Sequence, residues 1–150
     1  MPQSLSNTLI HLVYSTKHRA RVLTPEIRCE LFPYMAAILK DLWCPPLQVG
    51  GWEDHTHSLF QLGRTRCLAD VVKKLKTGTT MWMKSRWAGM DGFSWQVGYG
   101  ALPVGASEVQ RIRHYIERQE DHHREVSFQD EYRALLRAAG IDFDESYLWD

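Results

Sequence analysis

Residues 54–62, DHTHSLFQL, decide how the rest of the chain is interpreted. Successive side chains of a β-strand point to opposite faces of the sheet, so His55 and His57 are predicted to lie side by side on one face. Two imidazoles in that position can share a metal ion if further side chains complete its coordination. An isolated H-x-H pair is more often two hydrogen-bonded strand residues, so this stretch leaves both interpretations open.

The elements predicted around this stretch follow the order β-α-β-β-α-β, and two more helices come after them. Alternating apolar and β-branched residues predict strands, and apolar residues at three- and four-residue spacing predict helices. The predicted strands cover 8–16, 47–54, 55–62 and 93–105, and the predicted helices cover 24–42, 67–87, 108–123 and 127–140. This order indicates an α+β fold, a ferredoxin-like (RRM-like) sandwich in which an antiparallel sheet carries helices on one face.

The length of 150 residues and the 44% hydrophobic content predict one domain over residues 1–150. Three widely spaced cysteines without a C-x-x-C pair indicate neither a disulfide framework nor a zinc ribbon. The N-terminus lacks the pattern of a signal peptide, and no apolar run is long enough to span a membrane. We therefore expect a reduced, cytoplasmic protein with no membrane partner.

The formal net charge is zero, which by itself argues against a nucleic-acid-binding protein, but the charges are unevenly distributed. Between Arg64 and Arg86 seven basic residues accompany one acid, and residues 17–21 hold three bases and no acid. From Glu117 onwards ten acids face four bases. Such asymmetry suits a protein that holds an anion on one side. Solvated helix faces explain the charges equally well.

The predicted helix 108–123 carries a second group of polar side chains. At 100° per residue, Tyr115, Gln119 and His122 fall along one edge of its apolar face, at positions i, i+4 and i+7. A tyrosine, an amide oxygen and an imidazole therefore line one border of this helix. Taken alone, this is more typical of a tyrosine at the edge of a core beside two solvated residues.

Several fragments in the same order give the chain a family resemblance. They are HLVYSTKHR, DHTHSL, KKLKTGTTMWMK, WQVGYGALPVG, YIERQEDHH and FQDEYRALLRAAGIDFDE, and together they extend over nearly the whole sequence. The chain resembles the single-tyrosine HUH transposases, the insertion-sequence-200-like group and the related REP-associated tyrosine transposases. Members of this family are small metal-dependent DNA-strand transferases with a ferredoxin-like fold.

The resemblance implies a role for each of the polar residues singled out above. His55 and His57 match the HUH metal ligands, Gln119 matches the third ligand with His122 as the other possibility, and Tyr115 matches the nucleophile. The resemblance implies a divalent metal ion (Mg or Mn) and a 5′-phosphotyrosine intermediate with a free 3′-hydroxyl. It also implies a homodimer whose sites are shared between chains. Thr56 departs from the bulky apolar residue usual between the two histidines.

The substrate that the resemblance implies is single-stranded DNA with a hairpin. The basic segments then become predicted contacts to its phosphates: Lys17, Arg19, Arg21, Lys73, Lys74, Lys76, Thr77, Thr80 and Lys84.

Two other functions remain open at this stage. A non-catalytic, domesticated nucleic-acid-binding module on the same fold needs the basic helix but neither a metal nor Tyr115. A metal-dependent hydrolase using His55, His57 and His122 would release its product without a covalent link to DNA.

Overall fold

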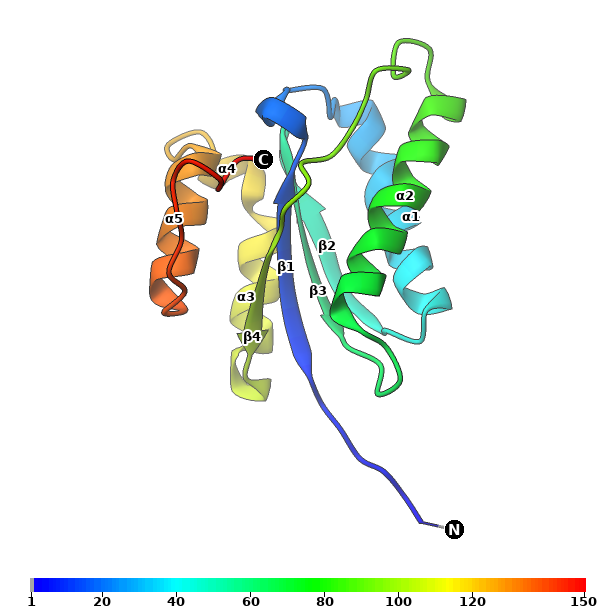
Figure 1. The fold of residues 1–150 in the computed structure, drawn as a ribbon, viewed down its shortest axis with the longest axis vertical. Helices are drawn as coiled ribbons and strands as arrows, with labels where there is room; N and C mark the ends of the chain where they lie inside the picture. Colours follow the sequence, from blue (N-terminus) through cyan, green and yellow to red (C-terminus); the bar gives the residue numbers. More distant parts are fainter. Residues whose placement is uncertain (1) are drawn as a thin grey trace.

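The computed structural model describes residues 2–150 and contains one four-stranded sheet with helices on both sides (Figure 1). The elements in chain order are β1 (Leu9–Ser15), η1 (Lys17–Arg19), α1 (Pro25–Asp41), β2 (Pro46–Gly51), β3 (His55–Gln61), α2 (Leu68–Arg86), β4 (Gly100–Val104), η2 (Ala106–Glu108), α3 (Val109–Glu117), α4 (Gln119–His122) and α5 (Phe128–Ala138). All four strands pair antiparallel in the order β2-β3-β1-β4. The predicted ferredoxin-like α+β fold is confirmed, but helices cover both faces of the sheet and not one face as predicted.

Helices α1 and α2 cover one face of the sheet and enclose the larger hydrophobic core, to which Leu12, Tyr14 and Phe60 contribute from the strands. Helix α1 begins as its sequence predicts, because the Thr24 hydroxyl accepts a hydrogen bond from the Ile27 amide at 3.3 Å. These are the two helices of the β-α-β-β-α-β unit, and they lie together on one face of the sheet, as a ferredoxin-like fold requires.

Helices α3 and α5 add a layer on the opposite face (Figure 1). A smaller core there joins Val13 of β1 and Leu102 of β4 to three residues of α5: Phe128, Tyr132 and Leu136. The sheet is therefore covered on both faces. The central strands β1 and β3 carry polar side chains into the second layer.

The chain over 106–123 differs from the single helix predicted there. It forms the 3-10 turn η2, then α3, and it breaks at Arg118, whose backbone (φ −97°, ψ 20°) leaves the helical region. The helix resumes as α4, with Gln119 buried at its start. The predicted strand 93–105 is also shorter, and β4 is an edge strand, which accommodates the missing amide of Pro103.

Helix α3 packs closely on β2 at Gly50. A Cβ atom added to Gly50 would lie 2.8 Å from both the Cγ2 and the backbone oxygen of Ile116. We predict that Gly50→Ala lowers the free energy of unfolding by about 1–3 kcal/mol, because α3 must shift away from the sheet. Chemical denaturation measures this loss.

Gly92→Ala is the matched control, since a Cβ atom at Gly92 meets nothing within 4 Å. It should change the free energy of unfolding by less than about 0.5 kcal/mol. Equal effects of the two substitutions would contradict the close packing of α3 on β2.

Candidate active site

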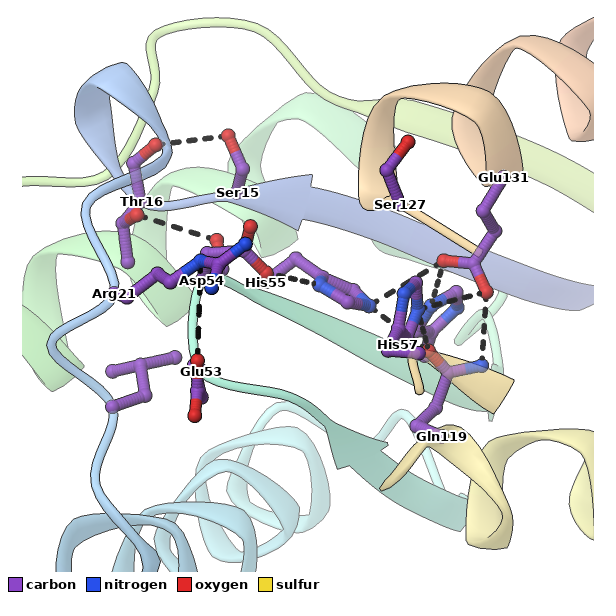
Figure 2. A network of polar contacts seen from close by, with 12 residues as sticks. Ser15, Thr16, Arg21, Glu53, Asp54, His55, His57, Gln119, Ser127 and Glu131 are labelled. Carbon is purple, nitrogen blue, oxygen red and sulfur yellow. Dashed lines mark hydrogen bonds and ion pairs between the residues drawn. The ribbon is translucent and has the colours of Figure 1, made fainter. Parts of the chain in front are cut away.

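The strands place three histidines under the second helical layer. His55 and His57 are fully buried on β3, and His11 is 1% exposed on the neighbouring strand β1. The register pairs Val13 with His57 and His11 with Leu59, so the three imidazoles occupy adjacent positions on one face of the sheet. Figure 2 shows His55 and His57 pointing towards Gln119 and Glu131. The predicted side-by-side placement of His55 and His57 agrees with this arrangement.

The break at Arg118 turns Gln119 towards these histidines. Gln119 is 1% exposed, and its Oε1 lies 2.9 Å from Nε2 of His55. Its amide nitrogen donates to Oε2 of Glu131 at 3.1 Å, which fixes the orientation of the amide group. Half-buried Tyr115, one turn earlier, donates its hydroxyl hydrogen to the same carboxylate. The structure therefore brings His55, His57, Tyr115 and Gln119 into one cluster.

Glu131, on α5, is the central residue that sequence analysis missed. It is 3% exposed, and its Oε1 lies 3.0 Å from Nε2 of His57 and 3.4 Å from Nε2 of His55. A sequence signal existed, because Glu131 is one turn from Phe128 and next to Tyr132, both on the apolar face of this helix. Its place within an acidic segment made it look like a solvated residue.

The two histidines after Gln119 differ in their surroundings. The side chain of His123 is 2% exposed; its Nδ1 donates to the Val126 carbonyl at 2.7 Å, and its Nε2 lies 2.9 Å from Oε1 of Gln119. The side chain of His122 is 31% exposed, and its Nε2 lies 3.1 Å from Oε2 of Glu131 without hydrogen-bond alignment. His123, which sequence analysis did not select, is therefore the more enclosed of the two.

Burial and charge shift the pKa values of the clustered groups in opposite directions. Burial lowers the pKa of His55, but its hydrogen bonds to Asp54 and Glu131 outweigh that effect and raise the pKa to about 9. Burial would raise the pKa of Glu131, yet the surrounding histidines hold it far below its usual range. Burial and the Glu131 charge raise the pKa of Tyr115, so its hydroxyl stays protonated.

The donor atoms of this cluster suit a divalent metal ion. Nδ1 of His55 lies 2.7 Å from the Asp54 carboxylate and donates to it, so a neutral His55 ring would present the lone pair of Nε2 to a metal ion. His123 is held in the same tautomer by Val126, and both Nε2 atoms face Oε1 of Gln119, which is itself an acceptor. In the metal-free protein a proton on His55 satisfies these acceptors, as the raised pKa of His55 indicates, and a bound metal ion could take the place of that proton. His55, His57 and Glu131 have donor atoms within 4.8 Å of one another, and so do His122, His123 and Glu131.

Comparison with known proteins identifies the family of this chain. The sequence profile described as "Transposase IS200 like" matches residues 4–119, more than half of the chain. The chain belongs to the IS200-like transposase family. The family expected from the sequence fragments is thereby confirmed, and with it a role in DNA transposition. No protein with a curated description matches the chain in sequence.

Two solved structures share the fold of this transposase. A candidate transposase from Deinococcus radiodurans R1 aligns with a TM-score of 0.62 and 24% sequence identity, over 79% of this chain and 98% of its own. A REP-associated tyrosine transposase bound to a REP hairpin aligns with a TM-score of 0.58 and 15% identity, over 98% of this chain and 96% of its own. Within residues 2–150, no helix is long and apolar enough to cross a membrane.

The predicted DNA-contacting residues of the transposase fall into two places. Arg19 and Arg21 line a cleft of about 250 Å³ beside the active-site cluster, the largely buried Asp54 and His123 also form part of its lining, and Lys17 is exposed nearby. The others are on α2, in the layer on the opposite face of the sheet: Lys73, Lys74, Lys76, Thr77, Thr80 and Lys84.

Lys76 has partners within the protein, unlike the exposed lysines of α2. Its ammonium group donates to the carbonyl oxygens of Gln96 and Gly98 at 2.7 Å and lies 4.9 Å from the centre of the Tyr14 ring. Burial lowers the pKa of Lys76 to about 8. These contacts hold the segment before β4 against α2 and argue against the predicted phosphate contact of Lys76.

Glu131→Gln should lower the free energy of unfolding of the metal-free protein by about 3–5 kcal/mol at neutral pH, because the buried histidines lose their counter-charge. Urea denaturation in the presence of a chelator measures this change. Asp130→Asn is the control: this neighbouring carboxylate is exposed and forms a surface ion pair with Arg133, so its loss should cost less than about 1 kcal/mol. Similar losses in the two variants would contradict the central placement of Glu131.

Proposed function

We propose that this transposase is a metal-dependent single-stranded DNA strand transferase with Tyr115 as its nucleophile. The observation that carries the proposal is the convergence of the Tyr115 hydroxyl, Gln119 and Glu131 on the paired histidines of β3. A tyrosine beside metal-ligating side chains can act as the nucleophile that attacks a phosphodiester. A hydroxyl group can later displace the tyrosine from the phosphorus.

In the proposed reaction, the phenolic oxygen of Tyr115 forms a bond to phosphorus and the bond from phosphorus to the 3′-oxygen breaks. The products are a 5′-phosphotyrosine and a free 3′-hydroxyl. The Tyr115 hydroxyl, which is hydrogen-bonded to Glu131, loses its proton as the bond to phosphorus forms, and the departing 3′-oxygen takes up one proton to become the hydroxyl. One phosphodiester is exchanged for another, so attack by a 3′-hydroxyl on the phosphotyrosine joins strands without ATP.

The residues that would hold the metal ion are His55, His57 and Gln119, with Glu131 as an additional carboxylate ligand. A bound Mg²⁺ or Mn²⁺ supplies positive charge that polarises the scissile phosphate and offsets the negative charge developing on it. The oxygen donors of Gln119 and Glu131 suit Mg²⁺ or Mn²⁺, whereas imidazole nitrogens suit later transition metals better. Asp54 holds the His55 ring through Nδ1, and the Tyr115 helix orients the nucleophile.

Within a single chain the proposed active-site residues lie close enough to contact one another. Tyr115 on α3 reaches Glu131 on α5 of the same chain, and Gln119 reaches His55 of the same β3. This supports cleavage by a site assembled in cis. The homodimer with shared sites that the family resemblance implied stays a prediction.

The proposed substrate is a DNA hairpin with an adjoining single strand. The fold is shared with a REP-associated tyrosine transposase that was solved with a REP hairpin bound. The Arg19–Arg21 cleft adjoins the active-site cluster and suits the strand being cut, whereas the exposed lysines of α2 suit duplex phosphates.

Tyr115→Phe should abolish the covalent protein–DNA adduct while leaving hairpin affinity within about threefold, because only the nucleophilic oxygen is removed. A denaturing gel with a labelled hairpin from the flanks of the gene, with Mn²⁺ or with chelator, measures adduct formation. Tyr147→Phe is the matched control, since Tyr147 is 73% exposed in the C-terminal segment. Hairpin binding without a metal-dependent adduct in the unmodified protein would favour a non-catalytic binding module.

Neutralising phosphate-contacting residues should weaken DNA binding in a salt-dependent manner. Two double variants remove two positive charges each: Arg19→Ala/Arg21→Ala and Lys73→Ala/Lys74→Ala. In each of them we expect the slope of log affinity against log salt concentration to become shallower by about 2. Lys40→Ala, at the exposed end of α1, should leave the slope unchanged. Fluorescence anisotropy at several salt concentrations tests this, and an unaltered slope in a double variant would remove its residues from the interface.

A further inference from the structure

His11 is a buried histidine that the proposed reaction does not use. It is 1% exposed on β1, and its Nε2 lies 2.8 Å from Nδ1 of His57, with the two rings stacked at a centroid distance of 5.0 Å. In the described chain 2–150, His11 is the hydrogen-bond partner that the structure gives to Nδ1 of His57. The opposite nitrogen of His57, Nε2, faces Glu131 at 3.0 Å.

A neutral imidazole carries one hydrogen, on either Nδ1 or Nε2, and only the bare nitrogen can bind a metal ion. Nε2 of His57 is the nitrogen that points into the ligand cluster, so metal binding requires the hydrogen to be on Nδ1. That hydrogen then needs an acceptor, because burial excludes water from this position. Nε2 of His11 is placed to accept it.

The same arrangement is present at the other strand histidine. His55 donates from Nδ1 to the Asp54 carboxylate at 2.7 Å and presents Nε2 to the cluster. At Nδ1 of His57, the structure places Nε2 of His11 where His55 has the Asp54 carboxylate. The two proposed ligands are thus each backed by an acceptor, one charged and one neutral.

We propose that His11 is a positioning residue of the metal site: it accepts a hydrogen bond from Nδ1 of His57 and so selects the tautomer of His57 that binds metal through Nε2. This inference rests on the proposed function, because it takes His57 as a metal ligand. His11 itself touches neither DNA nor the metal ion. Outer-sphere partners of this kind change metal affinity about 10- to 100-fold when they are removed.

The test uses His11→Phe, which keeps a ring but has no acceptor, and His11→Gln, whose side-chain oxygen can take the hydrogen bond. Mn²⁺ affinity is measured by the loss of the free-ion electron paramagnetic resonance signal. We expect His11→Phe to bind Mn²⁺ about 10- to 100-fold more weakly than the unmodified protein. We expect His11→Gln to remain within about threefold. A purely structural role would give no such rescue by the acceptor.

The second measurement needs no substitution at His11. In the Mg²⁺-saturated protein labelled with ¹⁵N, the imidazole spectrum should show His57 protonated at Nδ1, with a scalar coupling across the hydrogen bond to Nε2 of His11. A hydrogen on Nε2 of His57 in the metal-loaded state would overturn the inference. This spectrum decides the matter even if His11→Phe does not fold.

His57→Ala separates failure of this inference from failure of the proposed function. If the unmodified protein and His57→Ala bind Mn²⁺ equally, the proposed metal site itself is wrong. If His57→Ala loses binding while His11→Phe retains full affinity, the metal site stands and the role of His11 is wrong.

Discussion

The carboxylate of Glu131 on α5 joins the distant strand β3 to the neighbouring helices α3 and α4. Its oxygens face His57 of β3, the Tyr115 hydroxyl of α3 and the Gln119 amide of α4, while the rest of α5 packs on the sheet. A buried carboxylate is costly unless its charge is matched, so the position is stable only because these donors surround it. Docking of α5 and assembly of the proposed active site are therefore one event.

The two faces of the sheet have different roles. Helices α1 and α2 close a hydrophobic core that keeps the strands in register. On the other face, the same strands present three imidazoles to helices that supply a hydroxyl, an amide and a carboxylate. The basic residues follow this division, because α2 carries its lysines away from Tyr115 whereas Arg19 and Arg21 border the cleft next to His123. A hairpin that contacts both regions has to pass around an edge of the sheet.

Much of this arrangement could be predicted from local patterns. Strand alternation was enough to put His55 and His57 on one face, and helical spacing was enough to put Tyr115 and Gln119 on one edge. The break at Arg118 could not be predicted, since it depends on Gln119 packing against His55. Glu131 was missed, and the contact of His11 with His57 was not predicted, for a related reason: their partners are distant in sequence, and only the docking of α5 and the pairing of β1 with β3 bring them together.

The central claim is that the buried cluster under α5 is one metal site within a single chain. The most direct test is a crystal structure of the protein grown with Mn²⁺, with anomalous scattering recorded to locate the ion. The account predicts one strong Mn²⁺ peak at bonding distance, about 2.0–2.3 Å, from Nε2 of both His55 and His57, with Gln119 or Glu131 of the same chain completing the coordination. A fully occupied Mn²⁺ ion elsewhere, with His55 and His57 hydrogen-bonded only to protein groups, would contradict it.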